Sequence, residues 1–186
     1  MKKHVLFIHG AGEGAYKEDK KLADSLQKSL GSSYEVVFPK MENEEDADYA
    51  TWARQITGEV ASVDDAVILV GHSVGASVLL KYLAENKIKN TITGIFLIAA
   101  PFWGGDKGWT YDGYKTLELP SKADTELPND VPLFFYHSKD DETVPFAHLA
   151  LFAERFPNAI VSELDGRGHQ LNNDLSEVAD DVKKLG

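Results

Sequence analysis

Strand-like and helical stretches alternate along the whole chain. Runs rich in β-branched and aromatic residues, with the length of buried strands, lie at residues 4–9, 35–39, 66–71, 94–100, 132–138 and 159–164. Between them apolar residues recur at helical spacing, as Leu22, Leu26 and Leu30, as Tyr49, Trp52, Ile56 and Val60, and within 74–86, 146–156 and 174–185. We therefore expect an α/β fold, a three-layer α/β/α sandwich with a mostly parallel sheet of about six strands.

Length and composition are those of a compact globular chain. The 186 residues, 43% of them hydrophobic, suffice for one domain with a sizeable core. We expect that domain to span residues 1–186 without a separate cap domain. The first apolar stretch is only Val5–Ile8, and no 18-residue apolar run follows. We therefore expect a cytoplasmic protein with no membrane partner.

Several classes of function are excluded or disfavoured by composition. The absence of cysteine excludes disulfides, thiolate metal sites and a cysteine nucleophile. The net charge of −11 argues against a nucleic-acid partner. No metal-ligand spacing such as His-Glu-x-x-His occurs. We therefore expect chemistry that needs neither a metal nor a cofactor.

A serine motif lies between a predicted strand and a predicted helix. Residues 66–76 read Ala-Val-Ile-Leu-Val-Gly-His-Ser-Val-Gly-Ala, so that Gly71, Ser73 and Gly75 form Gly-x-Ser-x-Gly. A serine on a sharp strand-to-helix turn projects its hydroxyl clear of the sheet, and flanking glycines leave room where strand and helix converge. We interpret Ser73 as a nucleophile. The alternative is an ordinary serine at a helix N-terminus.

A candidate base follows the last predicted strand. The run at 159–164 leads into Asp165-Gly-Arg-Gly-His169. In an open α/β sheet, active sites form at the carboxyl ends of the strands, where this loop begins. The two glycines make the loop flexible enough to place the imidazole over Ser73. His169 is therefore the predicted general base, with an acid needed to orient it.

Three candidate acids follow the strand-like run at 132–138. Asp140 and Asp141 are adjacent, so their side chains point in different directions and only one can face His169. Glu142 is a further candidate. The alternative is that these are solvated turn acids, because aspartate is common in loops.

A glycine-rich loop leaves the first predicted strand. It reads His9-Gly-Ala-Gly-Glu-Gly14 and matches neither Gly-x-Gly-x-x-Gly nor a phosphate-binding loop. Beside a nucleophile of this kind, such a loop supplies one N–H of the oxyanion hole, and the residue after the serine supplies the other. We predict Ala11 and Val74 as the two donors.

The connection at residues 101–131 is long and rich in aromatic residues, glycine and proline. It leaves the carboxyl end of a predicted strand, so we expect it beside the serine. Phe102, Trp103 and Trp109 are predicted to line an acyl or alcohol pocket. The alternative is that they pin the loop to the surface. About 30 residues are too few for a large lid, which favours short, soluble substrates.

The remaining histidines are predicted to be structural. His137 ends a predicted strand and His148 lies in a predicted helix, where both would pack. His72 precedes the serine and points elsewhere on the turn, so we also expect it to pack.

Three motifs carry a resemblance to a known family. They are Val-Gly-His-Ser-Val-Gly75, Ser-Lys-Asp-Asp141 followed by Val-Pro145, and Gly-His169-Gln. In these the chain resembles the α/β-hydrolases, and specifically the small lidless serine hydrolases related to retinoblastoma-binding protein 9. The resemblance implies Ser73, Asp141 and His169 as the triad, because many members carry Asp-x-x-Val-Pro. The loop His-Gly-Ala-Gly is more similar to the broader esterase-like branch.

These observations predict a serine hydrolase that cleaves small soluble carboxylic esters or thioesters through an acyl-enzyme. The fold also hosts amidases and peptidases with the same triad. A third possibility is a protein-binding module on a hydrolase scaffold with little turnover. The sequence leaves open whether the chain is a monomer or a dimer.

Overall fold

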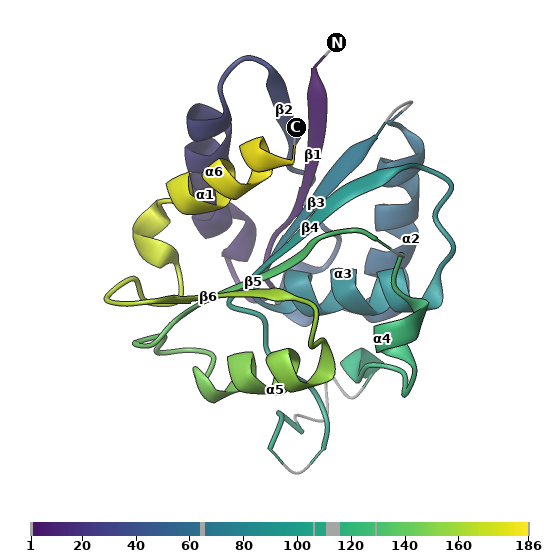
Figure 1. The fold of residues 1–186 in the computed structure, drawn as a ribbon, viewed down its shortest axis with the longest axis vertical. Coiled ribbons are helices and arrows are strands. Elements are labelled where there is room, and N and C mark those ends of the chain that lie inside the picture. Colours follow the sequence, from purple (N-terminus) through teal and green to yellow (C-terminus); the bar gives the residue numbers. More distant parts are fainter. Residues whose placement is uncertain (1, 64–65, 106, 111–115, 129, 186) are drawn as a thin grey trace.

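A six-stranded parallel sheet forms the centre of the molecule (Figure 1). The structure is a computed structural model and describes residues 2–63, 66–105, 107–110, 116–128 and 130–185. Its strands lie in the order β2-β1-β3-β4-β5-β6, and every neighbouring pair is parallel. The strands are β1 (Lys3–Ile8), β2 (Tyr34–Val37), β3 (Val67–His72), β4 (Ile92–Ile98), β5 (Leu133–Ser138) and β6 (Ile160–Leu164).

Helices cover both faces of this sheet. The α-helices are α1 (Ala15–Leu30), α2 (Tyr49–Ala61), α3 (Val74–Glu85), α4 (Ala123–Glu126), α5 (Ala147–Arg155) and α6 (Ser176–Lys184). Short 3₁₀ turns lie at η1 (Glu44–Asp46) and η3 (Leu171–Asn173). The apolar sides of α1 and α6 share one core with the sheet, and those of α2, α3 and α5 share the other. The predicted three-layer sandwich is confirmed.

Alternation along the central strands explains the two cores. In β1, Val5 and Phe7 face α1 and α6, whereas Leu6 and Ile8 face the opposite layer. All four side chains are buried. A strand buried on both faces has no polar side, which is why it reads as a continuous apolar run in the sequence. Edge strand β6 is more exposed, at 48% for Ile160 and 37% for Val161.

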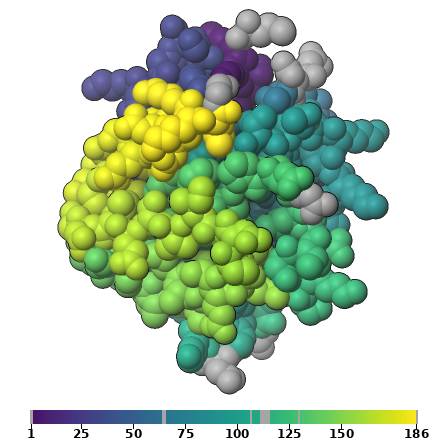
Figure 2. Space-filling view, in the orientation of Figure 1, coloured from purple at the N-terminus to yellow at the C-terminus, as the bar shows by residue number. Residues whose placement is uncertain are grey.

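The outer elements of the fold differ in their placement and in how they begin. Helix α6 and strand β6 both lie on the near surface in the space-filling view, α6 in yellow and β6 in yellow-green (Figure 2). Helix α2 begins where the Asp48 carboxylate accepts a hydrogen bond from the Thr51 N–H at 2.8 Å. The short helix α4 lies within the 101–131 connection, where the sequence predicted no element. Within the described residues, no helix combines the length and hydropathy that a membrane crossing requires.

Candidate active site

Ser73 sits on a strained turn between β3 and α3. Its backbone has φ 53° and ψ −130°, a conformation that side chains with a Cβ rarely adopt. The Ser73 N–H donates to the carbonyl of Ile98 at 2.9 Å, so the end of β4 fixes the turn from the side. Ser73 is 8% exposed. A strain of this kind persists only where the surrounding structure holds it.

The two glycines of the motif are required by space. A Cβ at Gly71 would lie 2.6 Å from the Cα of Ala76, where α3 turns back against β3. A Cβ at Gly75 would lie 2.1 Å from the carbonyl oxygen of His9, at the end of β1. The interpretation of the glycines as room for a converging strand and helix is confirmed. The second contact also shows that Gly75 lets the helix approach the loop after β1.

The structure brings Ser73, His169 and Asp141 together. His169 Nε2 lies 3.1 Å from Ser73 Oγ, and His169 Nδ1 lies 2.9 and 3.1 Å from the two Asp141 oxygens. Because Nδ1 faces a carboxylate, it carries the proton and leaves the Nε2 lone pair toward the serine hydroxyl. This is the relation that a nucleophile, a base and an orienting acid need.

Each candidate acid contacts the loop that carries His169, but in a different way. Asp140 accepts from the backbone N–H groups of Arg167 and Gly168 at 3.1 and 3.2 Å. Glu142 accepts from the His169 N–H at 3.1 Å. Asp141 alone of the three meets the imidazole. Asp140 and Glu142 therefore shape the loop, and Asp141 orients the ring.

The Asp141 carboxylate is fully buried and held from several sides. Its Oδ1 accepts from the Thr143 and Val144 N–H groups, each at 2.8 Å. His137 Nε2 lies 3.1 Å from Oδ2 and also donates to the Val144 carbonyl at 3.0 Å. Burial acts to raise the pKa of Asp141, but hydrogen bonds from His137 and His169 outweigh it and lower that pKa well below its usual range. The sequence predicted only a packing role for His137, and its contact with the Asp141 carboxylate was not predicted.

The loop after β1 lies against the serine. A Cβ at Gly10 would be 3.2 Å from the Ser73 Cβ. On the loop's far side, the Gly12 N–H donates to the Glu44 carbonyl at 2.6 Å. Ala11 lies between these two fixed points, and Val74 is the first residue of α3, so its N–H has no partner within the helix. Their role as oxyanion donors stays a prediction that this arrangement suits.

The geometry agrees with a comparison of sequence families. A model of the family described as serine hydrolase matches residues 8–176, a span that contains Ser73, Asp141 and His169. The chain belongs to this serine hydrolase family. No curated protein matches it.

Solved structures show how widely this hydrolase shares its fold. The ydeN gene product from B. subtilis superposes with a TM-score of 0.75 at 20% identity, covering 99% of this chain and 98% of that one. Est1E from Butyrivibrio proteoclasticus, solved with ferulic acid bound, gives 0.69 at 17% identity over 98% and 87% of the chains. The esterase RhEst1 from Rhodococcus sp. ECU1013 gives 0.70 at 16% identity over 99% and 90%. The expected α/β-hydrolase fold is confirmed.

The described aromatic residues at the start of the 101–131 connection, Phe102, Trp103 and Trp109, pack on one another and on α5. The rings of Trp103 and Trp109 meet edge to face at 5.4 Å. Trp109 also contacts His148 at 5.4 Å, and Phe102 contacts Phe152 at 5.0 Å. Trp103 is only 6% exposed. These contacts support the pinning of the connection, and the predicted role of Phe102, Trp103 and Trp109 in substrate binding stays a prediction.

His148 fixes the start of this connection. Its Nδ1 accepts from the Phe102 N–H at 3.0 Å, which requires a neutral ring with the proton on Nε2. Burial lowers the pKa of His148 to about 4, in keeping with that role. The Ser77 hydroxyl of α3 donates to the Pro101 carbonyl at 2.7 Å. The connection therefore begins from a fixed point one helical turn beyond Ser73.

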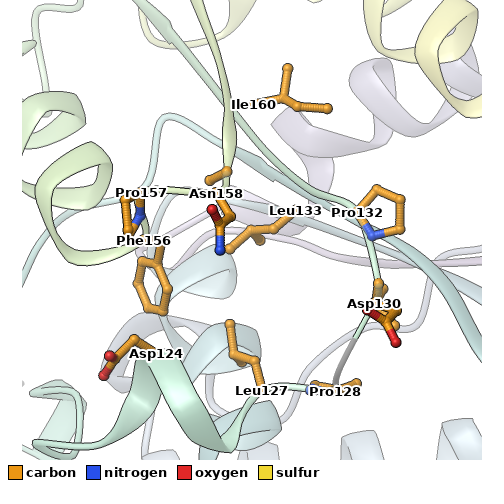
Figure 3. A pocket seen from close by; sticks show the side chains of 12 residues that line it. Asp124, Leu127, Pro128, Asp130, Pro132, Leu133, Phe156, Pro157, Asn158 and Ile160 are labelled. Carbon is orange, nitrogen blue, oxygen red and sulfur yellow. The ribbon is translucent and has the colours of Figure 1, made fainter.

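A cavity of about 540 Å³ lies at the amino ends of strands β5 and β6, away from the carboxyl ends that carry the serine site (Figure 3). Proline, leucine and other apolar side chains line it, together with Asp124, Asp130 and Asn158. Leu133 and Ile160, also in its wall, begin β5 and β6, whose other ends lead to Asp141 and His169. This cavity is therefore separate from the serine site.

Proposed function

We propose that this hydrolase cleaves small carboxylic esters or thioesters through an acyl-enzyme on Ser73. The observation that carries the proposal is the continuous hydrogen-bonded series from Ser73 Oγ through His169 to the Asp141 carboxylate. The series lies at the carboxyl end of the sheet, where α/β folds place their sites. The substrate is a small molecule with an activated carbonyl group.

The proposed reaction has two halves. Ser73 Oγ attacks the carbonyl carbon while His169 Nε2 takes its proton, and Asp141 stabilises the resulting imidazolium. The N–H groups of Ala11 and Val74 bind the oxyanion of the tetrahedral intermediate. His169 then gives the proton to the leaving alcohol or thiol, and the acyl-enzyme forms. A water molecule, deprotonated by His169, attacks the acyl-enzyme in the second half, and the acid product leaves as Ser73 regains its proton.

Two kinds of observation support an ester or thioester as the substrate class. The structures that share the fold include a named esterase, RhEst1, and Est1E with ferulic acid bound, although their identity to this chain is below 20%. Within the chain, the connection at 101–131 has about 30 residues, and its first two residues are hydrogen-bonded to α3 and α5. A connection of this length is too short to form a large lid domain, which favours short acyl chains in solution.

Hydrolysis of p-nitrophenyl esters from acetate to decanoate tests the proposal. We expect turnover that Ser73→Ala abolishes and that Ser62→Ala, a substitution at an exposed serine, leaves unchanged. A fluorophosphonate should label the protein on Ser73. If neither labelling nor turnover occurs, the chain is a binding scaffold and the proposal is wrong. Labelling with turnover of amides but not of esters would shift the class to amidases.

A further inference from the structure

A second buried aspartate–histidine pair lies beneath the proposed triad. Asp19 extends from α1 and His72 ends β3, and both side chains are only 1% exposed. Asp19 Oδ2 lies 2.8 Å from His72 Nδ1. Neither residue takes part in the reaction steps described above. Because a buried charge without compensating contacts is costly, the contacts of this pair indicate what it does.

The Asp19 carboxylate joins three segments of the site. Its Oδ2 accepts from the Gly10 N–H at 2.7 Å, in the loop proposed to bind the oxyanion. The same oxygen accepts from His72, the residue before the nucleophile. Its Oδ1 accepts from the Gln170 side chain at 3.0 Å, immediately after the proposed base. These partners lie 9, 53 and 151 residues from Asp19 in the sequence, so the carboxylate links segments that the chain does not hold together locally.

The contacts of His72 define its charge. Nδ1 faces the Asp19 carboxylate, and Nε2 lies 3.1 Å from the backbone carbonyl oxygen of His169. Both partners are oxygen acceptors, so both ring nitrogens must donate, and only the imidazolium can do so. The ionisable groups that face the ring are Asp19 from α1, His169 from the loop after β6 and Asp141 from the loop after β5. The ring centroids of His72 and His169 are 4.8 Å apart.

Electrostatics agree with an ion pair. Burial acts to lower the pKa of His72, but the Asp19 carboxylate outweighs it and raises that pKa above its usual range. For Asp19, burial acts to raise the pKa, and the charge and hydrogen bond of His72 outweigh it, lowering the pKa to about 2. These directions agree with the charged forms that the hydrogen bonds of His72 indicate.

We propose that Asp19 and His72 are positioning residues, a buried ion pair that sets the oxyanion loop, the nucleophile and the base in register with one another. The inference rests on the proposed function, because it assigns the pair to the alignment of that triad. Buried ion pairs add little net stability compared with apolar packing, whereas their hydrogen bonds are directional. A misplacement of about 1 Å in a reacting group costs roughly a hundredfold in rate, so alignment is where such a pair has its effect.

The kinetic test compares two aspartates of the same helix. Asp19→Asn removes the charge with little change in volume, and Asp24→Asn does the same at an exposed carboxylate paired with Lys20. With active sites counted by fluorophosphonate, we expect Asp19→Asn to lower kcat per site at least roughly tenfold while KM changes by less than about twofold. Asp24→Asn should change neither by more than about twofold. A wild-type kcat per counted site in Asp19→Asn overturns the inference.

A spectroscopic test needs no variant to fold. In the wild-type protein, ¹⁵N NMR of the ring of His72 should show protons on both nitrogens at pH 7. A neutral ring, with one protonated nitrogen, overturns the inference.

A second variant tests the pair from the histidine side. His72→Gln cannot donate on both sides, and we expect it to lower kcat as Asp19→Asn does. The double variant should be no slower than either single one, because the pair acts as a unit; additive losses would contradict this.

Failure of the inference and failure of the proposed function give different results. If the wild-type protein turns esters over and Asp19→Asn matches it in kcat per site, only the positioning role is wrong. If the wild-type protein shows no labelling and no turnover, the proposed function is wrong, and the positioning role falls with it.

Discussion

The two ends of the parallel strands differ in the side chains that are buried there. We call the side of the sheet where the strands end its carboxyl edge, and the side where they begin its amino edge. Among the described residues, buried polar and charged residues gather at the carboxyl edge: His9, Asp19, His72, Ser73, Ser77, His137, Ser138, His148 and His169, together with the buried carboxylate of Asp141. At the amino edge of β5 and β6, the walls of the cavity are mostly proline, leucine and other apolar residues. Burying a polar group costs free energy unless it is hydrogen-bonded. The carboxyl edge meets this cost with a network of contacts, and the site lies within that network.

The largest expected effect on rate distinguishes Asp141, the proposed orienting acid, from the adjacent Asp140. Asp141→Asn leaves the volume unchanged but favours the wrong His169 tautomer, and we expect kcat to fall roughly 10⁴-fold. Asp140→Asn weakens the hydrogen bonds that this side chain accepts from the Ser138 hydroxyl and from the Arg167 and Gly168 N–H groups, and it leaves the imidazole of His169 untouched. We expect kcat of the Asp140→Asn variant to fall by no more than about tenfold. Steady-state ester hydrolysis measures both, and equal losses would contradict the assignment of Asp141.

A glycine-to-alanine substitution should lower the free energy of unfolding more at the carboxyl edge than at the amino edge. In Gly75→Ala the new Cβ meets the His9 backbone carbonyl, which cannot move aside, so we expect the free energy of unfolding to fall by about 3 kcal/mol or more. In Gly94→Ala, in β4 near the amino edge, the Cβ meets the side chains of Leu185 and Phe96. The cost there should be about 1 kcal/mol. Urea unfolding compares them, and a larger loss for Gly94→Ala would contradict the contrast.

Acid should weaken the carboxyl edge through Asp19. Its pKa is about 2 in the folded protein and near 3.8 without the fold, so its stabilising effect is complete above pH 4 and is lost as the pH falls through 2. The difference amounts to about 2 kcal/mol in the free energy of unfolding. The stability gap between wild type and Asp19→Asn should therefore narrow between pH 4 and pH 2. Urea unfolding across that range measures the gap, and a constant gap would argue against a charged Asp19.

The smallest effect is expected at the cavity of the amino edge. Asn158 lines that cavity, on the side of the sheet that faces away from the serine site. Asn158→Ala should leave kcat/KM within about twofold of the wild-type value, because it touches no part of the hydrogen-bonded network. The same ester assay measures it. A loss of tenfold or more would show that the two edges are coupled.

Much of this arrangement was readable from local patterns. The alternation of apolar runs predicted the parallel sheet, since burial on both faces removes polar residues from a strand. The pattern around Ser73 predicted the turn, because only glycine at 71 and 75 leaves room for the backbones that converge there. The loops that directly follow two predicted strands indicated His169 and a short set of acids. These are features of neighbouring residues, and a sequence records them directly.

Contacts between distant segments were not readable in this way. From the sequence we expect His72 to pack, whereas the structure shows it hydrogen-bonded to Asp19, 53 residues away, and to the His169 carbonyl, 97 residues away. The residues themselves left Asp140, Asp141 and Glu142 as candidate acids, and only the family resemblance favoured Asp141. An isolated Asp19 on a charged helix looks like any solvated acid, because its burial depends on how α1 packs against the ends of β1 and β3. Local residue patterns therefore determined the fold and the predicted nucleophile. Only packing between remote segments decided which polar groups are buried together, because a hydrogen bond depends on distance in space and not along the chain.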